Sequence, residues 1–351
     1  MEALIVILAF VFVTGLCIGS FLNVVILRAL SNESIVFPTS KCPTCQKPLK
    51  WWHNIPVISY ICLGGKCAFC KEKISIQYPI VELLTAIIFT YIYAKFGFSI
   101  NTLFYWIVSS VLIVLAGTDI KEKVVFDAHT YTLIGLGLLF SAGYTIYYIA
   151  ADVRPITWLY NPLTMSILGL IAGVVIMEVF ARAGYLIAGT RAFGEGDTYI
   201  AAGLGALFGL QMLLLTLILS VIIQVTLFLP SFFRGLIENK DWKTLISFCS
   251  FCVYAAVFYV LQQNNLIENP IIYLFGAVLL AVLGLLSCMF IFKGLRENPS
   301  NRTYLPFGPA MVAAAFIIIL LFAHFGSQVF ACTDKMLCVG ACIPCLNMGG
   351  Y

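Results

Sequence analysis

Ten predominantly apolar stretches, separated by short polar loops, constrain the fold of this chain more than any other feature. A helix needs roughly 20 apolar residues to cross a hydrocarbon core of about 30 Å. Helices are the expected structure, because backbone groups inside a bilayer must bond to one another. The predicted spans are 3–28, 79–95, 101–118, 130–150, 162–188, 198–212, 213–233, 244–262, 270–292 and 308–330.

The composition agrees with a membrane protein. Hydrophobic residues make up 62% of the 351 residues and charged residues 10%, against about 45–50% and about 25% in soluble domains. We expect an all-α polytopic membrane protein with about eight to ten transmembrane helices. The first is expected to be uncleaved, because Glu2 stands where a secretory signal would be basic. The stretch 198–233 is long for one helix and short for two, and its Gly203, Gly205 and Gly209 would allow a short first helix or close packing.

The positive charges are distributed unevenly between the two sides of the predicted membrane. Of the 20 Lys and Arg residues, 17 fall on one side, and the other side holds only Lys95, Arg154 and Lys335. The positive-inside rule makes the basic side cytoplasmic. The cytoplasmic loops are then 29–78, 119–129, 189–197, 234–243 and 293–307, and both termini face outward.

The one sizeable loop carries two Cys-x-x-Cys pairs. Cys42 and Cys45 form the first pair and Cys67 and Cys70 the second, with 21 residues between the pairs. Four thiolates suit a closed tetrahedral zinc site, and the metal would supply folding energy that so small a domain lacks. Two disulfides are the alternative, which a reducing cytoplasm disfavours.

The other cysteines are expected to be structural. Topology places the tail cluster outside, where two disulfides are favoured over metal; its members are Cys332, Cys338, Cys342 and Cys345. Single cysteines in apolar stretches are expected to be buried, inert thiols; these are Cys17, Cys62, Cys249, Cys252 and Cys288.

Two aspartates stand at the cytoplasmic ends of predicted spans. Asp119 follows one apolar run, and Asp197 follows Gly194-Glu195-Gly196 and precedes another. Acids at membrane depth are candidates for function. Two carboxyl groups that share one proton are what an aspartyl protease needs, and Gly194 and Gly196 would let the backbone approach a peptide substrate closely.

Other interpretations of these acids stay open at this point. Asp197 stands where a helix N-cap could be, and either aspartate could be a solvated residue at the membrane boundary. Asp127 and Glu195 are nearby competitors for a catalytic role. The pair could also be proton-relay groups of a transporter, or the chain could be a non-catalytic scaffold of a secretion system.

An ordered series of motifs resembles the type IV prepilin peptidases, which are GxGD membrane aspartic proteases. The series covers most of 15–315 and consists of Gly19-Ser20-Phe21-Leu22-Asn23 with Arg28, the two Cys-x-x-Cys pairs, Tyr78-Pro79-Ile80-Val81-Glu82, Asp119, Gly194-Glu195-Gly196-Asp197 and Leu305-Pro306-Phe307-Gly308-Pro309. The resemblance implies that Asp119 and Asp197 are catalytic. It also implies cleavage after the leader glycine of prepilins or pseudopilins, and N-methylation of the new terminus with S-adenosylmethionine. A glycine-rich nucleotide fingerprint is not evident, so methylation rests on the resemblance alone.

The resemblance also implies location and partners. We expect a multi-pass protein of the bacterial inner membrane with its active site facing the cytoplasm, in contact with lipid and with pilus or type II secretion machinery, and not with nucleic acid. Three features depart from the family pattern: Phe126 replaces a proline, Tyr199 replaces a lysine, and the spans over 244–292 are extra.

The predicted organisation has five parts. These are a first transmembrane helix over 1–28, a cytoplasmic four-cysteine zinc loop over 29–78, a membrane peptidase core over 79–233, additional and C-terminal transmembrane helices over 234–330, and a cysteine-rich extracytoplasmic tail over 331–351. No internal repeat is expected.

Overall fold

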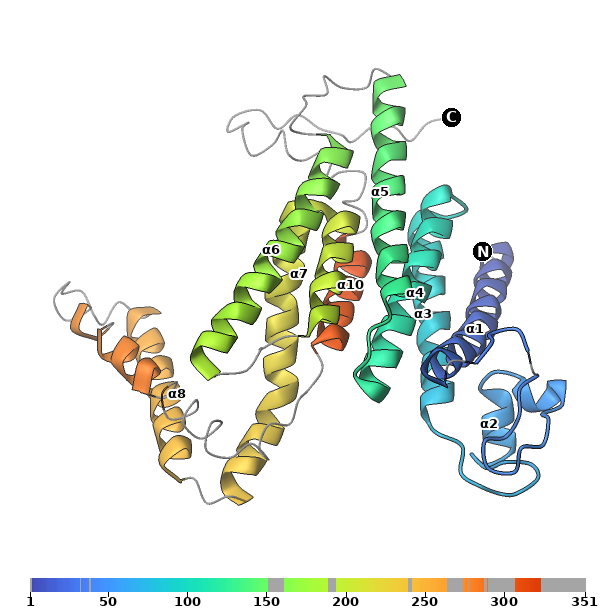
Figure 1. Ribbon diagram of the computed structural model, residues 1–351, viewed down its shortest axis with the longest axis horizontal. Helices are drawn as coiled ribbons and strands as arrows, with labels where there is room; N and C mark the ends of the chain where they lie inside the picture. The colour runs from blue at the N-terminus through green and yellow to red at the C-terminus, as the bar shows by residue number, and fades with distance from the viewer. Residues whose placement is uncertain are drawn as a thin grey trace. The chain divides into compact units, whose positions relative to one another are not determined.

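The computed structural model describes residues 2–31, 33–37, 39–150, 161–188, 194–238, 242–263, 274–276, 278–286, 289 and 307–322 (Figure 1). Its long helices are α1 (Glu2–Ser31), α3 (Gln77–Phe96), α4 (Ile100–Glu122), α5 (Asp127–Ala150), α6 (Pro162–Ala188), α7 (Glu195–Glu238), α8 (Trp242–Gln263) and α10 (Gly308–Phe322). Short turns of helix, η1 (Trp51–Asn54) and α2 (Ile58–Cys62), lie in the cysteine loop.

The predicted all-α polytopic fold is confirmed. Within the described residues, seven helices are long and apolar enough to cross a membrane, and two shorter apolar ones are Leu274–Leu286 and α10. The described residues contain isolated β-bridges but no strand. The protein is therefore a multi-pass membrane protein.

Small residues bring α1 against α3. Gly15 and Gly19 are one turn apart on α1, and a Cβ at either would lie 2.6–2.7 Å from the Cα of Ala86 or Glu82. Helices in lipid associate by such close backbone contact, because lipid supplies no hydrophobic drive between them. One turn further along, the Asn23 side chain donates a hydrogen bond to the Tyr78 carbonyl at 3.1 Å. Two motif segments far apart in sequence are thus held side by side.

Gly209 interrupts α7. Its backbone angles, φ 73° and ψ 174°, are not helical, and they lie in a region that only glycine adopts without strain. The prediction of two elements over 198–212 and 213–233 therefore has a structural counterpart, with the break at Gly209.

The part of α7 before Gly209 is enclosed by glycine contacts. Gly203 packs on Leu133 of α5, Gly137 of α5 packs on the Ala206 backbone, and Gly169 of α6 packs on the Gly205 backbone. The α6 residue Ser166 donates a hydrogen bond to the Ala206 carbonyl. This segment carries Asp197 at its start, so close packing on two sides fixes the position of that aspartate.

The chain divides into two compact units. The first contains α1 to α5, α6 up to Met177, α7 up to Ser220, and α10. The second contains the rest of α6 and α7 together with α8; within it, Phe233 packs edge-on against Phe248 with ring centroids 5.5 Å apart. Both predicted catalytic aspartates and the four predicted zinc ligands belong to the first unit. The five-part division from the sequence stays a prediction.

Candidate active site and metal site

Asp119 lies in the last turn of α4. The residue after the helix, Lys123, has a left-handed backbone (φ 56°, ψ 36°) and donates its N–H to the Asp119 carbonyl at 2.9 Å. The Asp119 side chain is only 4% exposed, and its Oδ2 atom makes no hydrogen bond to any residue that the structure describes. A buried carboxyl oxygen without a partner is costly, which marks this group as a functional candidate.

Asp197 lies in the first turn of α7 and is 5% exposed. The N–H groups of a first helical turn stabilise negative charge nearby. The next residue, Thr198, is also buried, and its hydroxyl oxygen has no partner within the described part of the chain. By contrast, the competing acids Asp127 and Glu195 are exposed. Burial therefore distinguishes the two predicted aspartates from their neighbours.

Gly308, the first residue of α10, lies between Asp119 and the helix that carries Asp197. A Cβ built on Gly308 would collide with Oδ2 of Asp119 and would lie 3.1 Å from Cδ1 of Ile200. Ile200 is three residues after Asp197, so the two share a face of α7. Three segments that are distant in sequence thus meet around the Asp119 carboxyl group.

A second contact joins the same two regions. Gly196 packs against Val125 in the turn after α4, and a Cβ at Gly196 would lie 2.6 Å from that side chain. Glycine is therefore required next to Asp197 for packing. The predicted role of Gly194 and Gly196 in substrate approach is not tested by this contact.

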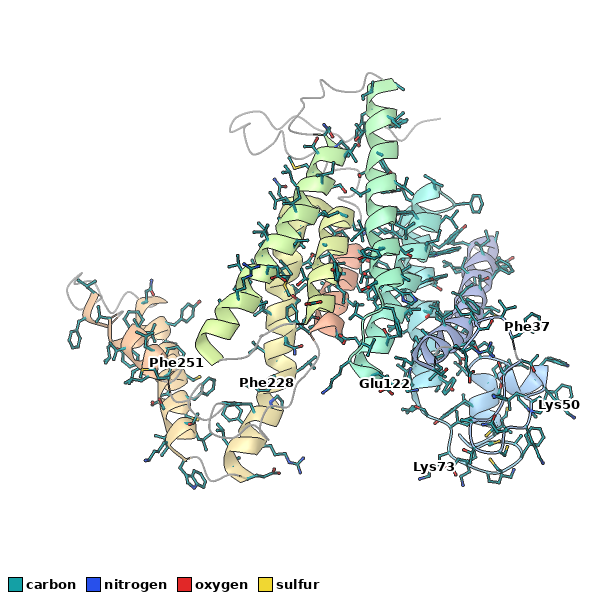
Figure 2. All side chains as sticks on the ribbon, viewed as in Figure 1. Phe37, Lys50, Lys73, Glu122, Phe228 and Phe251 are labelled. Carbon is teal, nitrogen blue, oxygen red and sulfur yellow. The ribbon has the colours of Figure 1, made fainter. Side chains whose placement is uncertain are left out.

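Figure 2 shows sulfur atoms gathered in the cysteine loop, between the labelled Lys50 and Lys73. Cys42, Cys45, Cys67 and Cys70 place all four Sγ atoms within 4.8 Å of one another. Cys42 Sγ and Cys70 Sγ are 3.8 Å apart, and all four cysteines are free thiols. The four predicted ligands can therefore hold one metal ion, and the disulfide alternative is not what the structure contains.

The two Cys-x-x-Cys pairs form equivalent turns, offset by 25 residues. In the first, Cys42 N–H bonds to Lys47 O and Gln46 N–H bonds to Cys42 O. In the second, Cys67 N–H bonds to Glu72 O and Lys71 N–H bonds to Cys67 O. The residue after each pair, Gln46 or Lys71, has a positive φ of 57° or 61°. This local repeat was not predicted from the sequence.

The turn geometry prepares Cys67 for metal binding. Backbone N–H groups of Cys70 and Phe69 point at its sulfur and lower the pKa of the Cys67 thiol to about 6. The thiolate is the form that binds metal. It is present at neutral pH and is lost as the pH falls through the lowered pKa.

The chain matches two sequence models. Residues 13–96 match the bacterial peptidase A24 N-terminal domain, and residues 106–229 match the type IV leader peptidase family. A protein of Neisseria gonorrhoeae named prepilin leader peptidase/N-methyltransferase is 34% identical over 235 residues, which are 60% of this chain and 77% of the relative. Proteins with the same name from Klebsiella pneumoniae (33% over 218 residues, 60% and 90%) and Xanthomonas campestris (30% over 278 residues, 73% and 91%) are similar.

The chain belongs to the type IV leader peptidase family. No solved structure matches it. The N-terminal match covers most of α1, the cysteine loop and α3, and the second match runs from within α4 to within α7. Gly308 lies outside both matches. Its place beside Asp119 was missed from the sequence, although the Pro-Phe-Gly-Pro motif that contains it was a usable signal.

The prediction that single cysteines are buried is wrong for the four that the structure describes. Cys17, Cys62, Cys249 and Cys252 are all exposed on the protein surface. Cys17, Cys249 and Cys252 lie on membrane-spanning helices, where apolar side chains can face lipid as readily as protein. The remaining predicted cysteines, Cys288 and the tail cluster Cys332 to Cys345, lie outside the described residues, as do Leu305 and Pro306.

Proposed function

We propose that this protein is a prepilin or pseudopilin leader peptidase in which Asp119 and Asp197 form the catalytic pair. The observation that carries the proposal is the burial of both carboxyl groups, while the neighbouring acids Asp127 and Glu195 are exposed. Substrates would be cut after the leader glycine, on the cytoplasmic face of the bacterial inner membrane.

The mechanism follows from the different surroundings of the two aspartates. Asp197, at the N-terminal end of α7, holds the negative charge that this helix end stabilises. It accepts a proton from water as the water oxygen attacks the scissile carbonyl carbon. Asp119, which is buried beside Gly308, carries the shared proton and donates a hydrogen bond to the carbonyl oxygen. Asp197 then gives the proton that it took from water to the amide nitrogen as the C–N bond breaks, and the carbonyl re-forms as the carboxylic acid at the end of the leader.

We assign zinc to the four-cysteine cluster as a structural metal. Zinc–sulfur bonds of about 2.3 Å in a tetrahedron place sulfur atoms about 3.8 Å apart, which is the separation between Cys42 and Cys70. All four coordination positions are filled by cysteine, as in structural rather than catalytic zinc sites. The ion would hold the two cysteine turns together.

A second activity is N-methylation of the newly formed N-terminus. S-adenosylmethionine, when bound, supplies the methyl group to the terminal amine. The protein would work in contact with lipid and with pilus or type II secretion machinery, because its substrates are the subunits of these assemblies. The transporter interpretation is not favoured. The buried acids Asp119 and Asp197 lie at the ends of helices, within sequence motifs that resemble those of the peptidase family.

The direct test uses the purified full-length protein in detergent with a prepilin-like peptide. We expect one cut after the leader glycine, and a further mass increase of one methyl group on the product when S-adenosylmethionine is present. Mass spectrometry of both fragments reads each activity separately. Absence of cleavage by a folded protein with several prepilin-like peptides would leave the transporter or scaffold interpretation.

Alanine at Gly308 is expected to reduce cleavage by about 100-fold, because a small displacement of a catalytic group can cost that much in rate. The new methyl group would collide with Asp119 Oδ2. Gly143→Ala in α5 is the matched control, since no atom of a described residue lies within 4 Å of a Cβ there. The measurement is the initial cleavage rate of each variant. Equal rates in Gly308→Ala and Gly143→Ala would contradict the role given to Gly308.

A further inference from the structure

A cavity of about 880 Å³ lies between the cysteine loop and the adjoining ends of α1 and α3. Its volume falls in the range of about 300–1,000 Å³ typical of small-molecule and cofactor sites. The lining combines aromatic and ionic side chains from both sides, among them Arg28, His53, Tyr60, Tyr78 and Glu82. The peptidase mechanism uses none of these residues.

Glu82 is the most unusual group in the wall. It lies inside the membrane-spanning helix α3 and is only 6% exposed. Oε2 accepts a hydrogen bond from the Val57 N–H at 2.7 Å, and the Ser20 hydroxyl contacts the same carboxyl group. A carboxylate can accept about four hydrogen bonds, so Glu82 keeps acceptor capacity toward the cavity. Acids at membrane depth are rare and are functional by default.

The residue that bonds to Glu82 has a strained backbone. Val57 has φ 60° and ψ −48°, and a positive φ is an outlier for a β-branched residue. Such strain persists only where the surroundings hold it, and it gathers at binding sites. The bond from Val57 to Glu82 ties the cysteine loop to α3 at the cavity wall.

We propose that this cavity binds S-adenosylmethionine, with the Glu82 carboxylate facing the cationic methyl donor. The proposal rests on the methyltransferase part of the proposed function and gives that activity a location. The cavity lies against the four-cysteine cluster, since Cys42 and Cys67 also line it. The zinc would therefore support the methyl-donor site by fixing one wall.

The chemical groups present match the ligand. S-adenosylmethionine has a sulfonium cation and an ammonium group for a carboxylate, a carboxylate for a guanidinium, and a flat base for aromatic rings. The cavity lining supplies all three partners. The carboxylate is that of Glu82, the guanidinium that of Arg28, and the aromatic ring that of Tyr78. The Arg28 side chain also holds the wall itself, by donating to the carbonyls of Ser34 and Ile35 at 2.7 and 3.0 Å.

Two different variants test the site in the full-length protein. Glu82→Gln removes the charge and keeps the shape. Thr44→Phe fills part of the cavity, and the chain already tolerates phenylalanine at the equivalent position of the second cysteine turn, Phe69. Glu122→Gln is the control, because Glu122 is an exposed acid at the end of α4 that does not line the cavity.

Binding of radiolabelled S-adenosylmethionine is measured by equilibrium dialysis, and cleavage of a prepilin-like peptide is measured without the methyl donor. We expect Kd to rise about 10- to 100-fold in Glu82→Gln, the range for a lost charge-assisted hydrogen bond. Thr44→Phe should weaken binding at least as much, and Glu122→Gln should bind like the wild type.

The two readouts separate this inference from the proposed function. Wild-type protein that cleaves but does not bind S-adenosylmethionine, or two cavity variants that bind it normally, would overturn the cavity assignment and leave the peptidase intact. Binding with no cleavage would instead count against the peptidase. Loss of both readouts in Glu82→Gln, with retained binding in Thr44→Phe, shows a structural role for Glu82 and also overturns the assignment.

Discussion

Asparagine at either Asp119 or Asp197 is expected to lower the rate of prepilin cleavage by at least about 10³-fold. General acid–base groups contribute about 10²–10⁴-fold in rate, and each aspartate is assigned one of these roles. Asparagine keeps the shape of the side chain but can neither accept a proton from water nor release one. The cleavage rate is measured in single-turnover experiments with a prepilin-like peptide. Thermal unfolding is measured in parallel to show that each variant is folded.

The controls are the exposed acids that compete for the same roles. Asp127→Asn and Glu195→Gln make the same chemical change at exposed side chains. Asp127 is eight residues from Asp119, and Glu195 is two residues from Asp197. Both should cleave within about threefold of the wild type. Loss of activity in Glu195→Gln together with normal activity in Asp197→Asn would move the catalytic role to Glu195.

Burial of the aspartates could not be predicted from their positions in the sequence. Asp119 stands at the end of one apolar run and Asp127 at the start of the next, yet Asp119 is buried and Asp127 is exposed. The difference arises because α10 brings Gly308 onto Asp119 from a point nearly 190 residues further along the chain. Periodicity and hydropathy describe local structure and do not contain such a long-range contact.

The positions of the helices were more predictable than the burial of the aspartates. Hydrophobic length alone places most of the spans, since the bilayer sets the length of a helix. The glycines of 198–233 could be interpreted either as packing residues or as a break. The structure uses them for both purposes, because Gly203 and Gly205 make close contacts while Gly209 adopts a positive φ of 73°.

The ligands of the four-cysteine site were predictable, but the equivalent turns of its two Cys-x-x-Cys pairs were not. Spacing within each Cys-x-x-Cys pair indicates a shared metal. The 25-residue repeat is carried by backbone hydrogen bonds and by two positive φ angles at Gln46 and Lys71, and neither residue type signals that conformation. The cavity beside the site was also unpredictable, because its wall joins segments from three separate motifs.

Serine at Cys67 is expected to release the metal and to unfold the four-cysteine loop. A serine hydroxyl is a far weaker zinc ligand than a thiolate, and the ion would keep three protein ligands. In the described part of the loop, the regular structure consists of two short helical turns and two isolated bridges, so metal binding supplies most of its folding free energy. Zinc content should fall from about one ion per chain to below about 0.1, and trypsin should cut at the loop lysines at least about tenfold faster.

Cys62→Ser is the matched control for this prediction. Cys62 lies in the same loop and is an exposed free thiol outside the four-cysteine cluster. It should keep both its zinc and its resistance to trypsin. If Cys67→Ser also kept both, the cluster would not be a metal site that holds the loop together. If it lost zinc but stayed resistant, the fold would rest instead on the contact between Val57 and Glu82, which ties the loop to α3 without the metal.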